Sequence, residues 1–149
     1  MARALPPIRK IAVAIAGKSA NPQTLHEAVR LANQLGAELR AVHIRYPAAG
    51  KATFMMDALP VFTEDDVREH FRRRGYKELA ASIPVKIFTG NNPAKLLARV
   101  TKSADLLVIG HRHRNWLVKV LSTAPVQQQL MDVVECPVLV VPTKRRSAR

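Results

Sequence analysis

Residues 110–124, GHRHRNWLVKVLSTA, bring together side chains that could bind an anion. The segment directly follows the apolar run 105–109 and begins with Gly110, at the place where many α/β proteins bind phosphate. Glycine lets the main chain approach a phosphate without an intervening Cβ, and the N–H groups at the start of the next helix attract the anion. Because this loop carries only one glycine, the question is whether it binds a nucleotide or has lost that ability.

Side chains could rebuild an anion site in the absence of further glycines. Arg112 and Arg114 offer planar sets of donors, and His111 and His113 add charge when they are protonated. The alternative is that these side chains point to solvent simply because the loop is exposed, and we favour that interpretation over a dedicated ligand site. If the histidines contribute, anion affinity should rise as the pH falls through about 6.5.

The same loop offers little for a metal ion or for catalysis. His111 and His113 have no third Cys, Asp or Glu nearby in the sequence, whereas a zinc site needs three or four ligands. Ser19, Ser122 and Thr123 lack a spacing that would identify a partnered base. We therefore expect neither a metal site nor catalytic residues, and predict that the protein is not an enzyme.

Length and composition indicate one ordinary domain, residues 1–149. The chain has 149 residues of which 48% are hydrophobic, enough for a substantial core. Its single cysteine, Cys136, cannot form an internal disulfide and is interpreted as a small core residue, which favours a reducing, cytoplasmic location. No segment approaches the ~20 apolar residues of a membrane span, so we expect no membrane partner.

Charge is the unusual feature of the composition. Lys and Arg number 24 against 11 Asp and Glu, a net charge of +13, which attracts polyanions. Part of the excess lies in the C-terminal residues 143–149, expected to form a flexible basic tail, and part in the run 72–74, interpreted as a solvated helix face. Weak nonspecific binding of nucleic acid is therefore a possible partner interaction, although aromatic residues for base stacking are only 5% of the chain.

Alternating strands and helices must position these residues. Apolar runs predict strands at 8–16, 37–44, 83–89, 105–109 and 137–141. Helical spacing predicts a helix after the Asn21 cap that ends at Gly36, one beginning at Thr63, one after the turn 90–93, and one over 125–133. This order indicates a parallel sheet with helices on both faces, whose ligands lie beyond the carboxyl ends of the strands.

Two features of this arrangement bear on function: the glycines that follow strands, and the last strand. Gly17, Gly90 and Gly110 each follow a predicted strand, at the ligand-binding edge of such a sheet. The last strand, 137–141, is apolar on both faces, as expected of an edge strand covered by another surface. A homodimer would provide that cover, and its candidate interface residues are Val138, Leu139, Val140 and Val141.

Several segments together resemble the universal stress protein family, from Ile11 to Val141. They are KIAVAIAG at 10–17, AVHI at 41–44, GNNP at 90–93, ADLLVIG at 104–110 and ECPVLVVP at 135–142. The resemblance implies a single-domain α/β fold like that of the adenine nucleotide alpha hydrolases. It has an open five-stranded parallel sheet in the order 3-2-1-4-5, with helices on both faces, and members commonly dimerise through the last strand.

The resemblance also shows where the nucleotide motif departs from the family pattern. Members that bind ATP carry a glycine, two residues, a second glycine, nine residues, and a third glycine followed by Ser or Thr. Here Gly110 matches the first position, but His113, Thr123 and Ala124 stand at the others. Ala16 stands where those members place an Asp against the nucleotide. Four expected contacts are therefore changed.

This pattern resembles the branch typified by universal stress protein A, which is regarded as not binding ATP. The matching segments are GHRH at 110–113, the aromatic at 115–116 and STA at 122–124. We therefore expect a non-catalytic stress-response protein with a degenerate nucleotide-binding loop and no cofactor. Two alternatives stay open: binding of ATP or AMP by a modified loop, and association of a basic protein with nucleic acid. The candidate nucleotide or anion-binding residues are Ala16, Gly17, Gly110, His111, Arg112, His113, Ser122, Thr123 and Ala124.

Overall fold

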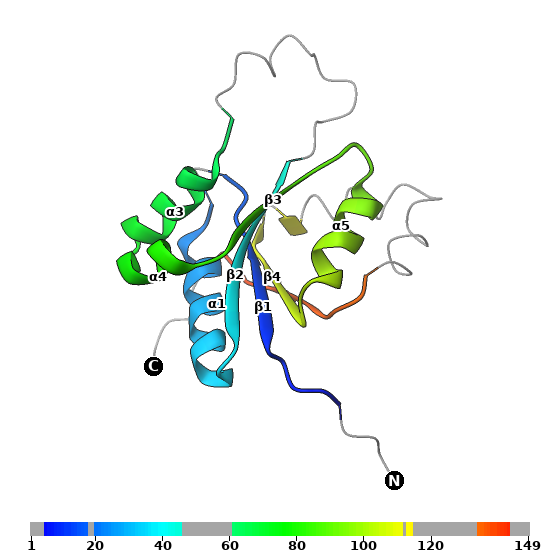
Figure 1. Cartoon of the computed structure of the whole chain (residues 1–149), viewed down its shortest axis with the longest axis horizontal. Helices are drawn as coiled ribbons and strands as arrows, with labels where there is room; N and C mark the ends of the chain where they lie inside the picture. Colours follow the sequence, from blue (N-terminus) through cyan, green and yellow to red (C-terminus); the bar gives the residue numbers. More distant parts are fainter. Residues whose placement is uncertain (1–4, 18–19, 46–60, 112, 115–133, 144–149) are drawn as a thin grey trace.

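The computed structural model describes residues 5–17, 20–45, 61–111, 113–114 and 134–143 (Figure 1). Its centre is a five-stranded parallel sheet in the order β3-β2-β1-β4-β5, which confirms the expected fold. The strands are β1 (Lys10–Ala14), β2 (Glu38–Arg45), β3 (Val85–Thr89), β4 (Leu106–Ile109) and β5 (Val138–Val140). In register, Ile11 of β1 lies between Leu39 of β2 and Leu106 of β4.

Helices cover both faces of this sheet. On one face lie α1 (Pro22–Leu35), α3 (Glu64–Arg73) and α4 (Lys77–Ser82), and on the other lies α5 (Pro93–Lys102) (Figure 1). The side chains of β1 alternate between two cores: Ile11 and Val13 pack on the α1 side, and Ala12 and Ala14 pack on the α5 side. Burial on both faces explains why this strand has no polar alternation.

The caps expected from the sequence set the bounds of α1. The Oδ1 atom of Asn21 accepts from the Gln23 N–H at 2.9 Å, and Pro22 is the first helical residue. Gly36 ends the helix with φ 63°, a left-handed conformation that glycine adopts readily. These contacts confirm the predicted helix. They also fix the first turn of α1 beside the end of β1.

The segment after β2 differs from the sequence prediction. Helix α3 starts after Thr63 as expected, in a capping box with Asp66, and Gly75 at φ 90° follows its end. A second short helix, α4, then runs over Lys77–Ser82 and was not predicted. Its N-cap residue, Tyr76, makes no side-chain capping bond, so the sequence gives no start signal for it. The predicted helix over 125–133 lies outside the described residues.

The first and last strands are shorter than the apolar runs that predicted them. The first strand was expected over 8–16 and forms over Lys10–Ala14, and the last was expected over 137–141 and forms over Val138–Val140. Apolar residues beyond the ladder still pack, because Ile15 is 1% exposed and Val141 is 5% exposed. Hydrophobic burial therefore extends past the hydrogen-bonded pairs. In the described part of the chain, no helix is long and apolar enough to cross a membrane.

Candidate functional site

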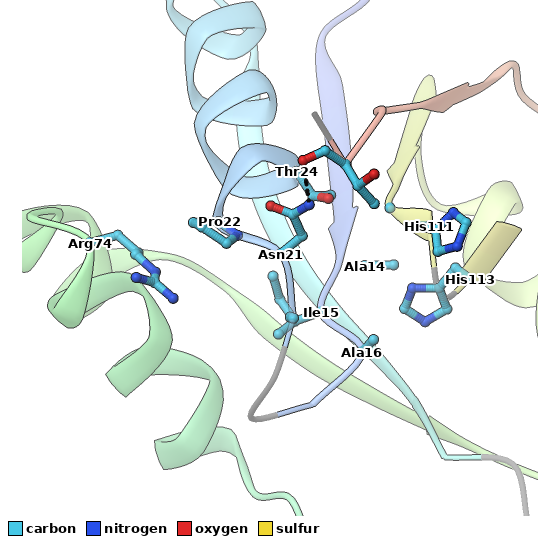
Figure 2. Close-up of a pocket in the computed structure, with 12 residues that line it drawn as sticks. Ala14, Ile15, Ala16, Asn21, Pro22, Thr24, Arg74, His111 and His113 are labelled. Carbon is cyan, nitrogen blue, oxygen red and sulfur yellow. Dashed lines mark hydrogen bonds between the residues drawn. The ribbon is translucent and has the colours of Figure 1, made fainter. Parts of the chain in front are cut away.

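A cavity of about 460 Å³ lies at the carboxyl ends of β1 and β4, beside the first turn of α1 (Figure 2). This is the edge of the sheet where ligands of parallel α/β folds bind, and the volume is in the range of small-molecule sites. Its walls come from β1 and the residues after it, from α1, from the end of α3, and from the turn after β4. The fold therefore brings segments distant in sequence to one concave surface.

The structure places some of the predicted site residues in this cavity. Ala16, Gly110, His111 and His113 line it. Gly17 follows Ala16 but does not line the cavity. Arg112, Ser122, Thr123 and Ala124 lie outside the described residues. The polar lining residues Asn21, Thr24, Arg74 and Thr143 were not predicted as site residues.

His113 is turned inward. Its side chain is only 8% exposed, whereas His111 is exposed. Burial, and to a smaller extent the charge of His43, lowers the pKa of His113 to about 4. His113 is therefore neutral at pH 7 and gives no positive charge to an anion. His113 therefore does not become protonated near pH 6.5, and it cannot cause the rise in anion affinity that the sequence suggested at that pH.

A helical turn begins directly after β4. The main-chain N–H of Arg114 donates to the carbonyl of Gly110 at 3.0 Å. That N–H is consequently satisfied within the chain and does not face the cavity as a free donor. The turn also carries the His113 side chain to the inside.

His43 ties the end of β1 to β2. Its Nδ1 lies 2.8 Å from the carbonyl oxygen of Ile15, and since a carbonyl only accepts, Nδ1 carries the proton. The ring also lies 4.7 Å, between centroids, from the ring of Phe62. Burial lowers the pKa of His43, because the charged form of the ring would lose its hydration. Sequence reasoning assigned His43 only to a strand and missed this contact.

Gly110 has a steric reason to be glycine. A Cβ at this position would collide with the Oγ1 atom of Thr24, a buried residue in the first turn of α1. The absent side chain lets α1 pack closely against the end of β4. Close helix packing thus accounts for this glycine without any phosphate.

Among the described residues that line the cavity, Arg74 is the only Lys, Arg, Asp or Glu. It lies just after α3, and within the described residues it forms no ion pair, whereas Arg72 and Arg73 both pair with Glu69. In Figure 2, Arg74 lies on one side of Asn21 and Ile15, and the two histidines lie on the other side. The cavity therefore has one guanidinium without an ion-pair partner, on the wall opposite the turn after β4.

Within the part of the chain that the structure describes, no group of three His, Cys, Asp or Glu side chains is placed to hold a metal ion. Cys136 is 8% exposed and packs in the core on the α5 side. Burial raises the pKa of its thiol, so it is mostly protonated near neutral pH.

Comparison with solved structures shows the same fold in other proteins. A universal stress protein from Lactobacillus plantarum has a TM-score of 0.55 and 19% identity, over 92% of this chain and 99% of that one. A universal stress protein family member from Burkholderia pseudomallei has a TM-score of 0.53 and 24% identity, over 91% and 96%. One from Archaeoglobus fulgidus, solved in complex with dAMP, has a TM-score of 0.50 and 19% identity, over 89% and 96%.

A search of the curated proteins finds no match to this chain. The family model of the universal stress proteins, in contrast, matches residues 7–142, which is nearly the whole chain. This match agrees with the β3-β2-β1-β4-β5 order of the sheet and with the similar folds of the solved structures. The chain belongs to the universal stress protein family.

Proposed function

We propose that this universal stress protein is a non-catalytic protein of the stress response that does not hold ATP through a glycine phosphate loop. The observation that carries the proposal is the buried imidazole of His113, 8% exposed, at the second glycine position of the family's motif. A phosphate at this position needs main chain that it can approach and a favourable charge. A buried, neutral side chain supplies neither.

Two other residues of the cavity support the same proposal. Ala16 lines the wall with a methyl group, where nucleotide binders of the family carry an Asp. Gly110 keeps its glycine, but Thr24 occupies the space beside it. The cavity thus lacks a polar partner at the end of β1 and open main chain at the end of β4.

Equilibrium binding of labelled ATP to the whole chain, with and without Mg²⁺, tests the proposal. We expect no saturable binding in the micromolar range, which corresponds to about −8 kcal/mol. The variant His113→Gly/Thr123→Gly/Ala124→Ser restores the glycine pattern and should gain at least tenfold in affinity. Its matched control, Thr123→Gly/Ala124→Ser, keeps the imidazole and should not gain. Micromolar binding by the unaltered protein would refute the proposal.

A second candidate function is supported by Arg74. The cavity of about 460 Å³ and its unpaired guanidinium suit a small ligand with one phosphate, such as AMP. The Archaeoglobus fulgidus relative with dAMP supports this candidate, since its fold is similar. Titration of AMP in the same assay, against the variant Arg74→Gln, separates the two candidates: AMP binding that depends on Arg74 favours the second.

We also propose that the protein is a cytoplasmic homodimer that associates through β5. This edge strand exposes two large apolar side chains, Leu139 at 39% and Val140 at 42%, and Val138 is partly exposed beside them. Val141, the fourth predicted interface residue, is already buried in the core on the α1 side. The lone, buried Cys136 supports a reducing compartment.

A further inference from the structure

Four basic residues form one exposed surface on the α5 side of the sheet, which we call the α5 basic face: Lys86, Lys95, Arg99 and Lys102. On α5, the last three follow each other at intervals of four and three residues, the spacing that places side chains on one side of a helix. The other side of α5 is apolar and buried through Leu96, Leu97 and Val100. All four basic side chains are exposed.

An aromatic ring joins the strand and helix parts of this face. The Lys86 Nζ lies 5.0 Å from the centroid of the Phe88 ring, and the Arg99 guanidinium carbon lies 5.4 Å from the same centroid. Phe88 itself is 1% exposed. Attraction between the cations and the ring keeps the two charges side by side, although they repel each other. These contacts restrict the side chains of Lys86 and Arg99 before a partner binds, so that binding costs less side-chain entropy.

Among the residues that the structure describes, no acidic side chain forms an ion pair with the α5 basic face. No Asp or Glu occurs in the sequence between Glu78 and Asp105. The Asp105 carboxylate accepts from the main-chain N–H groups of Arg9 and Lys10, both at 2.9 Å. Glu135 comes near the end of α5, where its main-chain N–H donates to Thr101 Oγ1 at 3.1 Å.

The ion pairs of the described residues lie elsewhere. They join arginines of α1, β2 and α3 to nearby glutamates, in the pairs Arg30–Glu27, Arg40–Glu38, Arg68–Glu64, Arg72–Glu69 and Arg73–Glu69. Within the described residues, the four cations of the α5 basic face have no such partner. The positive charge of this face is therefore available to an external anion.

We infer that the α5 basic face binds duplex DNA through its phosphates, without reading the base sequence. Lys102 lies seven positions after Lys95, which at 1.5 Å per residue makes a row about 10 Å long. One strand of DNA presents a phosphate about every 3.4 Å along the axis, so the row spans about three phosphates. Lys86 adds a fourth cation beside Arg99.

Other anionic partners fit this face less well. The exposed large hydrophobic residues of the described chain are Leu5, Leu35, Val61, Leu139 and Val140. None belongs to the α5 basic face, which thus lacks the apolar anchors of protein interfaces and of membrane-binding surfaces. Because Phe88 is buried, the face also has no ring on which the bases of a single strand could stack. Phosphates of a duplex require only the cations.

Fluorescence anisotropy with a short labelled DNA duplex, at increasing salt, tests the inference. The variant K86Q/K95Q/R99Q/K102Q should lose at least tenfold in affinity, and the slope of log K against log salt should become shallower by about 3 to 4. Deletion of residues 144–149 is the matched control, since it also removes four basic residues, namely Lys144, Arg145, Arg146 and Arg149. The deletion should retain most of the affinity.

Several results would overturn the inference. They are no binding of the duplex by the unaltered protein, no loss in the quadruple variant, or equal losses in both variants, which would show an effect of net charge alone. Equal or tighter binding of single-stranded DNA, duplex RNA, polyglutamate or anionic vesicles would assign the face to a different partner. If the quadruple variant does not fold, Lys95→Gln/Lys102→Gln leaves the contacts with Phe88 intact and should still lose affinity and salt dependence.

Discussion

Burial of His113 should make the folded protein less stable in acid. Its pKa is about 4 in the folded chain, against an ordinary value near 6.5 when the chain unfolds. Below pH 6.5 the His113 side chain takes up a proton in the unfolded chain but not in the folded chain, so the free energy of unfolding falls. The contribution of His113 to stability is therefore complete above about pH 6.5, declines as the pH falls towards 4, and changes no further below that.

The size of this effect follows from the difference between the two pKa values. A difference of about 2.5, at 1.36 kcal/mol for each pKa unit, corresponds to about 3 kcal/mol. Domains of this kind are stable by about 5 to 15 kcal/mol, so the loss is a large fraction. The pKa values of His43 and His70 are also lowered by burial, and both histidines add to the loss in the same direction.

Urea unfolding of the unaltered protein and of His113→Gln, from about pH 7 to about pH 4.5, isolates the contribution of His113. The difference in unfolding free energy between the two proteins should shift in favour of the variant by about 2 to 3 kcal/mol across this range. His113→Leu should show the same shift, although its packing and its stability at pH 7 differ. A difference that stays constant with pH would refute the burial of His113 as a neutral imidazole.

Two further predictions concern packing and assembly. Gly110→Ala should destabilise the fold by about 1 to 3 kcal/mol, because its Cβ meets Thr24 Oγ1, and Thr24→Ala in the same chain should recover most of that loss in thermal or urea unfolding. Equal losses with and without Thr24→Ala would contradict the steric argument. Leu139→Lys/Val140→Lys should give a monomer in sedimentation equilibrium, whereas Leu35→Lys, at an exposed leucine of α1, should leave the proposed dimer intact. A dimer that survives the β5 change would place the interface elsewhere.

Local signals in the sequence predict the elements of this fold well, because their causes are local. The Asn21 cap and Gly36 mark α1 at both ends, and buried strands appear as continuous apolar runs. Helix α4 escaped prediction because it is only 6 residues long and begins at Tyr76 without a side-chain cap. The strand order came from resemblance to the family, since periodicity alone does not fix how strands are arranged.

The cavity was less predictable, since packing between distant segments creates it. Arg74 reads in the sequence as one of three basic residues on a solvated helix, yet it lines the cavity opposite the turn after β4. His113 reads as a loop side chain, yet the helical turn closed by Gly110 and Arg114 buries it. Neither placement has a local signal. Both depend on where α3 and β4 lie relative to α1.

Gly110 shows why a matching glycine is a weak sign of phosphate binding. A phosphate loop needs glycine so that the main chain can lie against the ligand. Here the same absence of a Cβ leaves room for the Thr24 Oγ1 atom of α1, so packing favours glycine at this position whether or not a ligand is present. At position 113 no such packing contact calls for a glycine, and the larger His113 side chain fits there because it turns inward and is buried. Loss of nucleotide binding in this fold should therefore change the second glycine position more readily than the first.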